Sequence, residues 1–177
     1  MNALEQHRAD EEALSRWVRE HSRPILGYLV SLTGRYDVAE DLLQDVFRKA
    51  WQARDRYQEQ SFERAYLLRI ADRLACDRAR RLGLEVTVSD DAWRGMEPAC
   101  EMETAAETLV REESIHELQQ ALETLSLAQR RVLLLRYYGN LDFSQIATTL
   151  GCPLGTVLSH CRRGLLALRK LLAENMS

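Results

Sequence analysis

The stretch DFSQIATTLGCPLGTVLSHCRR, residues 142–163, decides the fold of the C-terminal part of this 177-residue chain. Asp142 followed by Gln145 three residues later is a capping-box pattern, which predicts that a short helix begins here. Gly151 and Pro153 then predict a sharp turn into a second helix. That second helix is basic and carries Arg162, Arg163, Arg169 and Lys170. A short helix, a glycine-containing turn and a basic second helix form the layout of a helix-turn-helix.

Periodicity alone leaves two interpretations of this segment open. In a helix-turn-helix that binds DNA, the first residues of the second helix face base edges in the major groove, and basic side chains bind phosphates. Those first residues would be Gly155, Thr156, Leu158, Ser159 and His160. The alternative is a helical hairpin whose basic face is merely solvated.

The N-terminal half shows helical periodicity throughout. Apolar residues recur every three or four positions between Leu14 and Leu32, the spacing that keeps one face of a helix in a core. Pro24 interrupts this pattern and predicts that a new helix starts there. Thr33 and Gly34 predict its end.

Two further helices are expected before residue 83, and one more after the acidic segment. Asp37 with Glu40 is a capping-box-like start for a helix with a wide apolar stripe. A basic helix rich in arginine should run from near residue 61 to Leu82. Ser126 with Gln129 repeats the capping-box pattern and predicts a helix that continues to about residue 138.

The distribution of charge indicates two domains and a linker. Residues 1–82 hold 15 basic and 14 acidic side chains, residues 83–113 hold 2 and 9, and residues 114–177 hold 7 and 4. Periodicity is also lost where the acids gather. We therefore predict an all-α protein with two small helical domains, residues 1–82 and 105–177, joined by a flexible acidic linker over residues 83–104.

Composition excludes several classes of protein. The longest apolar runs are only a few residues long, so no membrane insertion is expected, and the N-terminus lacks the pattern of a secretory signal. The four cysteines, at positions 76, 100, 152 and 161, show no paired spacing of a zinc site or disulfide framework. No glycine-rich phosphate loop or catalytic set can be identified. We expect a cytoplasmic protein that is not an enzyme and uses no metal or other cofactor.

Three segments, in order along the chain, resemble the extracytoplasmic-function (ECF) sigma factors of the sigma-70 family. DVAEDLLQDVFRKAW, residues 37–51, resembles the region that binds core RNA polymerase. AYLLRIADRLACDRARR, residues 65–81, resembles the region that opens the minus-ten promoter element. Residues 125–169, which include the helix-turn-helix segment, resemble the fourth region, which binds the minus-thirty-five element. The ordered set covers most of the chain and implies a transcription factor that binds core polymerase and promoter DNA.

The resemblance assigns a polymerase-binding role to the first segment. Asp41, Gln44, Asp45 and Phe47 match positions that contact the clamp helices of the beta-prime subunit. The alternative is that the polar residues form a solvated face and that Phe47 belongs to the core, as its place in the apolar stripe also allows.

The resemblance implies that the basic helix binds the separated strand of the promoter. The expected minus-ten residues are Arg64, Arg69, Asp72, Arg73, Arg80 and Arg81, with arginines on phosphates and a pocket for an unstacked base. The alternative is that the arginines are ordinary surface residues. Family members commonly have Asn where this chain has Asp72, and an acid there would repel phosphate and change the hydrogen bonds available to a base.

The minus-thirty-five residues implied by the resemblance are Gly155, Thr156, Leu158, Ser159, His160, Arg162 and Arg163. The family's common GTVKSR pattern appears here with Leu158 in place of Lys and His160 in place of Arg. Two expected phosphate contacts are thereby weakened, so binding should depend more on Arg162 and Arg163.

The resemblance also implies partners, namely the beta-prime clamp helices and the beta flap of polymerase, promoter DNA and an anti-sigma factor. A second hypothesis keeps the protein partners but not promoter DNA. In it the chain is a degenerate sigma-like interaction module that binds polymerase or a regulator without recognising promoters, because its altered recognition helix has lost contacts.

Overall fold

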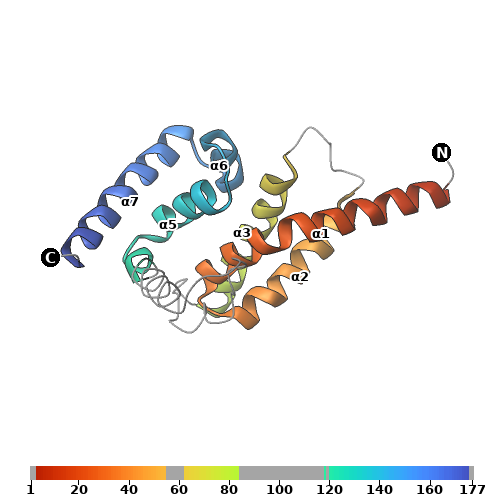
Figure 1. The fold of residues 1–177 in the computed structure, drawn as a ribbon, viewed down its shortest axis with the longest axis horizontal. Coiled ribbons are helices and arrows are strands. Elements are labelled where there is room, and N and C mark those ends of the chain that lie inside the picture. The colour runs from red at the N-terminus through yellow and green to blue at the C-terminus, as the bar shows by residue number, and fades with distance from the viewer. Residues whose placement is uncertain (1–2, 55–61, 84–117, 119, 176–177) are drawn as a thin grey trace, which may run out of the picture.

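A computed structural model describes residues 3–54, 62–83, 118 and 120–175, and these residues form only helices and the turns between them. The all-helical prediction is confirmed. Figure 1 shows two groups of helices side by side, one from each half of the chain. The predicted linker, residues 83–104, lies outside the described residues apart from Gly83, which ends its helix in a left-handed conformation with φ of 62°.

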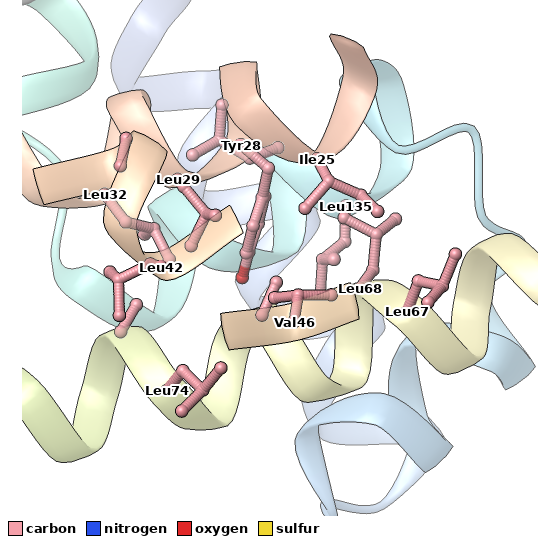
Figure 2. Packing of buried hydrophobic residues seen from close by; sticks show 14 of the residues in the cluster. Ile25, Tyr28, Leu29, Leu32, Leu42, Val46, Leu67, Leu68, Leu74 and Leu135 are labelled. Atoms are coloured by element: carbon pink, nitrogen blue, oxygen red, sulfur yellow. The ribbon is translucent and has the colours of Figure 1, made fainter. Parts of the chain in front are cut away.

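The N-terminal half is a bundle of three helices that all pack against one another: α1 (Ala3–Thr33), α2 (Tyr36–Gln52) and α3 (Glu63–Leu82). Their apolar stripes meet in a common core, in which Ile25, Leu29 and Val46 are completely buried. Figure 2 shows these side chains between the helices. The periodicity of the sequence therefore predicted the buried faces correctly.

Two predicted details of the N-terminal half are wrong. Helix α1 continues through Pro24 without a break. The proline cannot donate a backbone hydrogen bond. However, Trp17 before it and Ile25 after it both lie in the core, which an unbroken helix allows. Helix α2 begins at residue 36 after an extended Arg35 that makes no side-chain cap. Asp37 is not the N-cap, because it lies inside the first turn of α2, where its Oδ1 accepts a hydrogen bond from Arg35 Nε at 3.1 Å.

The C-terminal half contains α5 (Leu127–Leu133), η3 (Leu134–Tyr138), α6 (Phe143–Leu150) and α7 (Leu154–Asn175). The capping box of Ser126 and Gln129 is confirmed. The helix that follows was predicted to continue to about residue 138, and its last five residues form a π-helical turn. The amide of Gly139 closes this turn on the carbonyl of Leu134 at 2.8 Å.

The two halves share one hydrophobic core. Helix α1 packs on η3, and α3 packs on α6. Leu135 of η3 is completely buried, and Figure 2 shows it beside Ile25 and Leu68. Glycines allow this close approach: a Cβ on Gly27 would lie 2.0 Å from the hydroxyl oxygen of Tyr138, and a Cβ on Gly139 would lie 2.8 Å from Leu68 Cδ1.

Candidate nucleic-acid interface

The predicted helix-turn-helix is formed by α6, the turn after it and α7. Asp142 Oδ1 accepts a hydrogen bond from the backbone amide of Gln145 at 2.8 Å, and Gln145 Oε1 accepts one from the amide of Asp142 at 2.9 Å. Both halves of the predicted capping box are therefore present. Gly151 ends α6 with a left-handed φ of 64°, a conformation that glycine adopts without strain. The turn is thus fixed by local sequence.

Helix α7 has a buried face and an open face. Val157 and Cys161 are buried, and a Cβ added to Gly164 would lie 2.9 Å from Leu133 Cδ1, so α7 packs closely on α5. The open face carries five of the seven residues expected to bind the minus-thirty-five element; they are Gly155, Leu158, Ser159, Arg162 and Arg163. The other two, Thr156 and His160, are half-buried.

The arginines at the middle of α7 are available for a ligand. Arg162 and Arg163 are both exposed. Arg163 is held along the helix, with its Nη2 3.4 Å from His160 Nδ1 and its Nε donating to the Ser159 carbonyl at 3.4 Å. This face can therefore present positive charge to the phosphates of a nucleic acid.

Helix α3 displays three of its six expected minus-ten residues to solvent. Arg73, Arg80 and Arg81 are exposed, whereas Arg64 and Arg69 are half-buried. The guanidinium of Arg80 pairs with Asp77 at 2.9 Å, and that of Arg69 lies 5.8 Å from the centre of the Tyr66 ring. An arginine stacked on an aromatic ring keeps its outward N–H groups free for phosphate.

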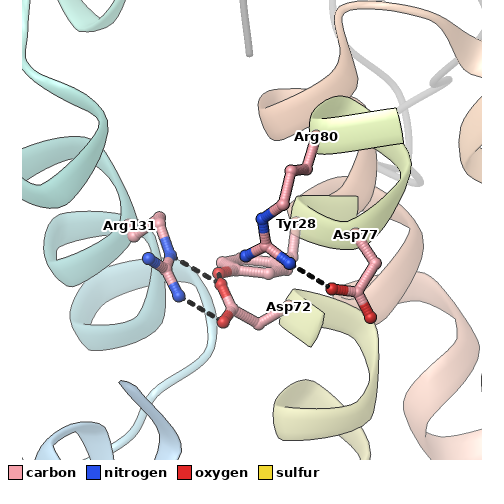
Figure 3. A network of polar contacts seen from close by, with 5 residues as sticks. All are labelled: Tyr28, Asp72, Asp77, Arg80 and Arg131. Atoms are coloured by element: carbon pink, nitrogen blue, oxygen red, sulfur yellow. Dashed lines mark hydrogen bonds and ion pairs between the residues drawn. The ribbon is translucent and has the colours of Figure 1, made fainter. Parts of the chain in front are cut away.

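Asp72 is the exception, because it faces the other half of the chain. It is only 2% exposed. Arg131 of α5 approaches it with two nitrogens: Nε donates to Oδ1 at 2.7 Å, and Nη2 donates to Oδ2. The Tyr28 hydroxyl of α1 also donates to Oδ1, at 2.7 Å. Figure 3 shows the carboxylate enclosed by these two partners.

The ionisation of Tyr28 and Arg131 favours their hydrogen bonds to Asp72. Burial raises the pKa of the Tyr28 hydroxyl well above its ordinary value, and the negative charge of Asp72 raises it further. Burial lowers the pKa of Arg131, but the hydrogen bond and charge of Asp72 outweigh burial and leave it above its ordinary value. Arg131 therefore remains a cation and Tyr28 a neutral donor at physiological pH.

The acidic face of α2 lies in the open. Asp41 and Gln44 are exposed, and Asp45 is half-buried and accepts a hydrogen bond from Arg48 Nη2 at 2.7 Å. Phe47 is only 9% exposed and belongs to the core. The three polar residues can therefore contact a partner protein, whereas Phe47 packs in the core beneath the helix.

Sequence reasoning missed Tyr28, Arg130 and Arg131. Arg130 is buried, donates to the carbonyls of Leu122 and Glu123 at 3.0 and 2.9 Å, and so ties residues 120–123 to α5. No local signal could have indicated the pairing of Arg131 with Asp72, because 59 positions separate them. Two adjacent arginines in the last turn of a short helix suggest only a solvated surface.

One group of described residues has the composition of a metal site. Ligand atoms of Glu20, His21 and Glu63 lie within 4.8 Å of one another. However, Glu63 Oε1 accepts a hydrogen bond from Arg16 Nη2 at 2.6 Å, so a cation already compensates this carboxylate. We assign no metal to the group. Among the described helices, none has the length and apolar character needed to cross a bilayer.

Comparison with known proteins gives matches in both halves. The sigma-70 region 2 family model matches residues 17–84, and the sigma-70 region 4 model matches residues 115–168. The chain is 30% identical over 171 residues to the ECF RNA polymerase sigma factor SigL of Mycobacterium tuberculosis, covering 94% of this chain and 93% of that protein. It is 29% identical to the RNA polymerase sigma-H factor of Pseudomonas aeruginosa, covering 93% and 89%.

Solved structures share the fold. The sigma factor RpoE of Bartonella quintana, determined in complex with the anti-sigma factor NepR, superposes with a TM-score of 0.69 at 23% identity, covering 92% of this chain and 98% of that one. CnrH, determined with the cytosolic domain of CnrY, superposes with a TM-score of 0.66 at 21% identity, covering 93% and 90%.

Replacing Arg131 by Met should strongly destabilise the protein, because it leaves the Asp72 carboxylate buried without a cation. We expect the free energy of unfolding to fall by about 3–5 kcal/mol, measured by urea denaturation with circular dichroism. The double variant Arg131→Met, Asp72→Asn should recover part of this loss. Arg80→Met, which removes an exposed ion pair, is the control and should cost at most about 1 kcal/mol. If Arg131→Met and Arg80→Met lower the free energy of unfolding equally, the pairing of Arg131 with the buried Asp72 carboxylate does not have the expected importance for stability.

Proposed function

Because the chain belongs to the ECF group of RNA polymerase sigma factors, we propose that three of its helical segments bind different targets: α2 binds core polymerase, α3 the minus-ten element, and α6 with α7 the minus-thirty-five duplex. A sigma factor is a transcription initiation factor and not an enzyme, so the polymerase carries out the chemistry. The observation that carries this proposal is the open basic face of α7 within an intact helix-turn-helix.

The minus-thirty-five assignment follows from the shape and charge of α7. Its first turns are exposed at Gly155, Leu158 and Ser159, where a recognition helix meets base edges. Arg162 and Arg163 follow on the same open surface and can neutralise phosphates. Residues 154–173 of α7 include no acid, so no carboxylate in this part of the helix repels the DNA.

The minus-ten assignment is supported by the exposed arginines of α3. Arg73, Arg80 and Arg81 can contact the phosphates of a separated strand in the arrangement described. Asp72 cannot, because Arg131 occupies its carboxylate. A contact between Asp72 and a promoter base would require Arg131 to move away first.

The core-binding assignment is supported by Asp41, Gln44 and Asp45 on the open face of α2. A line of acid and amide groups complements a basic partner surface and guides its approach. We also place the protein in the cytoplasm and assign it an anti-sigma partner. The second assignment is supported by the fold that it shares with RpoE, which was determined with an anti-sigma factor.

Run-off transcription tests promoter recognition directly. Purified core polymerase is incubated with fragmented genomic DNA, with and without this protein. We expect discrete new transcripts whose upstream sequences share two elements. Binding to core polymerase without any new transcript would instead favour the interaction-module hypothesis.

Changing Asp41 and Asp45 together to Lys should weaken binding to core polymerase, because two acidic contacts become repulsive towards a basic surface. Both side chains lie outside the core, so the helical content should stay the same. The matched control reverses two exposed acids on α1, Glu12 and Glu20. Affinity is measured by fluorescence anisotropy of labelled protein. If both double variants bind core polymerase as the parent does, α2 does not make this contact.

Changing Arg162 and Arg163 together to Ala should weaken binding to the minus-thirty-five duplex and flatten its salt dependence. Each phosphate contact contributes about 0.9 to the slope of log affinity against log salt, so the slope should fall by about 2 units. The control removes two exposed cations elsewhere, Arg19 and Lys49. An unaltered slope would mean that Arg162 and Arg163 neutralise no phosphates.

A further inference from the structure

Two leucines dominate the start of the open face of α7. Leu154 and Leu158 lie one helical turn apart, and each is 44% exposed. They line a shallow hollow together with Asp142, Phe143 and Ser144 from the start of α6. Contact of large apolar side chains with water is unfavourable, so a partner that covers these leucines gains free energy from burying them.

The surroundings of these leucines fit a nucleic acid as the covering partner. Arg162 lies one turn beyond Leu158 and is exposed. A Cβ on Gly155 would meet no atom within 4 Å, so a groove edge can come close to the backbone there. The carboxylate of Asp142 accepts a hydrogen bond from the backbone amide of Gln145, which offsets its charge beside the hollow.

The chemistry of leucine narrows what it can recognise. Its side chain has no donor or acceptor, so it cannot read the hydrogen-bonding edges that distinguish guanine, cytosine and adenine. Thymine alone among the four bases presents an apolar group in the major groove, its C5 methyl. A leucine that meets a base edge there therefore favours thymine and leaves the polar edges of other bases unpaired.

We propose that Leu158, assisted by Leu154, reads thymine methyl groups in the minus-thirty-five element. This inference rests on the assignment of α7 to that element. It gives Leu158 a direct role in specificity: where a Lys would contribute charge, Leu158 contributes selection for a methyl group.

Deoxyuridine substitution tests this directly, because uracil differs from thymine only by the missing methyl. The probe is a promoter found by run-off transcription, bound by holoenzyme assembled from core polymerase and the full chain. Each thymine of its upstream element is replaced in turn. We expect at least one replacement to weaken binding by about fourfold, the loss for one buried methyl group, and replacements outside the element to have no effect.

Variants identify the residue that reads the methyl. Leu158→Ala should weaken binding to the thymine duplex and abolish its preference over the uracil duplex. Leu158→Lys should abolish the preference while strengthening binding through phosphate contact. Leu166→Ala is the control, since Leu166 is 57% exposed further along α7, and it should retain the full preference.

The outcomes separate this inference from the proposed function. Equal binding of thymine and uracil duplexes by the unaltered protein overturns the inference while leaving promoter binding intact, and this result needs no variant to fold. A preference that persists in Leu158→Ala also overturns it. Loss of core-polymerase affinity in Leu158→Ala, with duplex binding unchanged, would assign the leucines to a protein contact. Absence of any sequence-dependent duplex binding would overturn the minus-thirty-five assignment itself.

Discussion

The arrangement of the helices depends on the buried carboxylate of Asp72. It lies on α3, accepts hydrogen bonds from Tyr28 on α1 and from Arg131 on α5, and so joins both halves of the chain. A buried ion pair of this kind adds little net stability, because desolvating both charges costs about as much as their attraction returns. Losing either partner is costly, however. The network therefore acts mainly to select one way of packing the two halves.

Close packing around this network allows little variation. Gly27 on α1 lies against Tyr138, and Gly139 lies against Leu68 of α3, so a side chain at either glycine would require these neighbours to shift. The π-helical turn Leu134–Tyr138 lies at the same boundary and carries Leu135 into the shared core. Polar pairing and steric fit thus select the same arrangement.

This packing covers part of one proposed binding surface and leaves the others exposed. The face of α3 that carries Asp72 is covered, whereas Arg73 on the same helix is open. The outer face of α7 and the acidic face of α2 are both exposed in the same arrangement. Leu158 is an exposed apolar residue one turn before the exposed Arg162, and an uncharged side chain there is better suited to select a base than to attract DNA.

The sequence by itself determined the helices, most of their ends and the identity of their buried faces, because these depend on interactions within a few residues. The capping boxes at Ser126 and Asp142 and the left-handed Gly151 are of this kind. It could not determine that α1 would continue through Pro24, since the packing of the whole bundle offsets the lost hydrogen bond. Nor could it place Asp72 against Arg131. That contact spans 59 positions, and only the tertiary fold decides which of the chain's many charges will meet in a buried site.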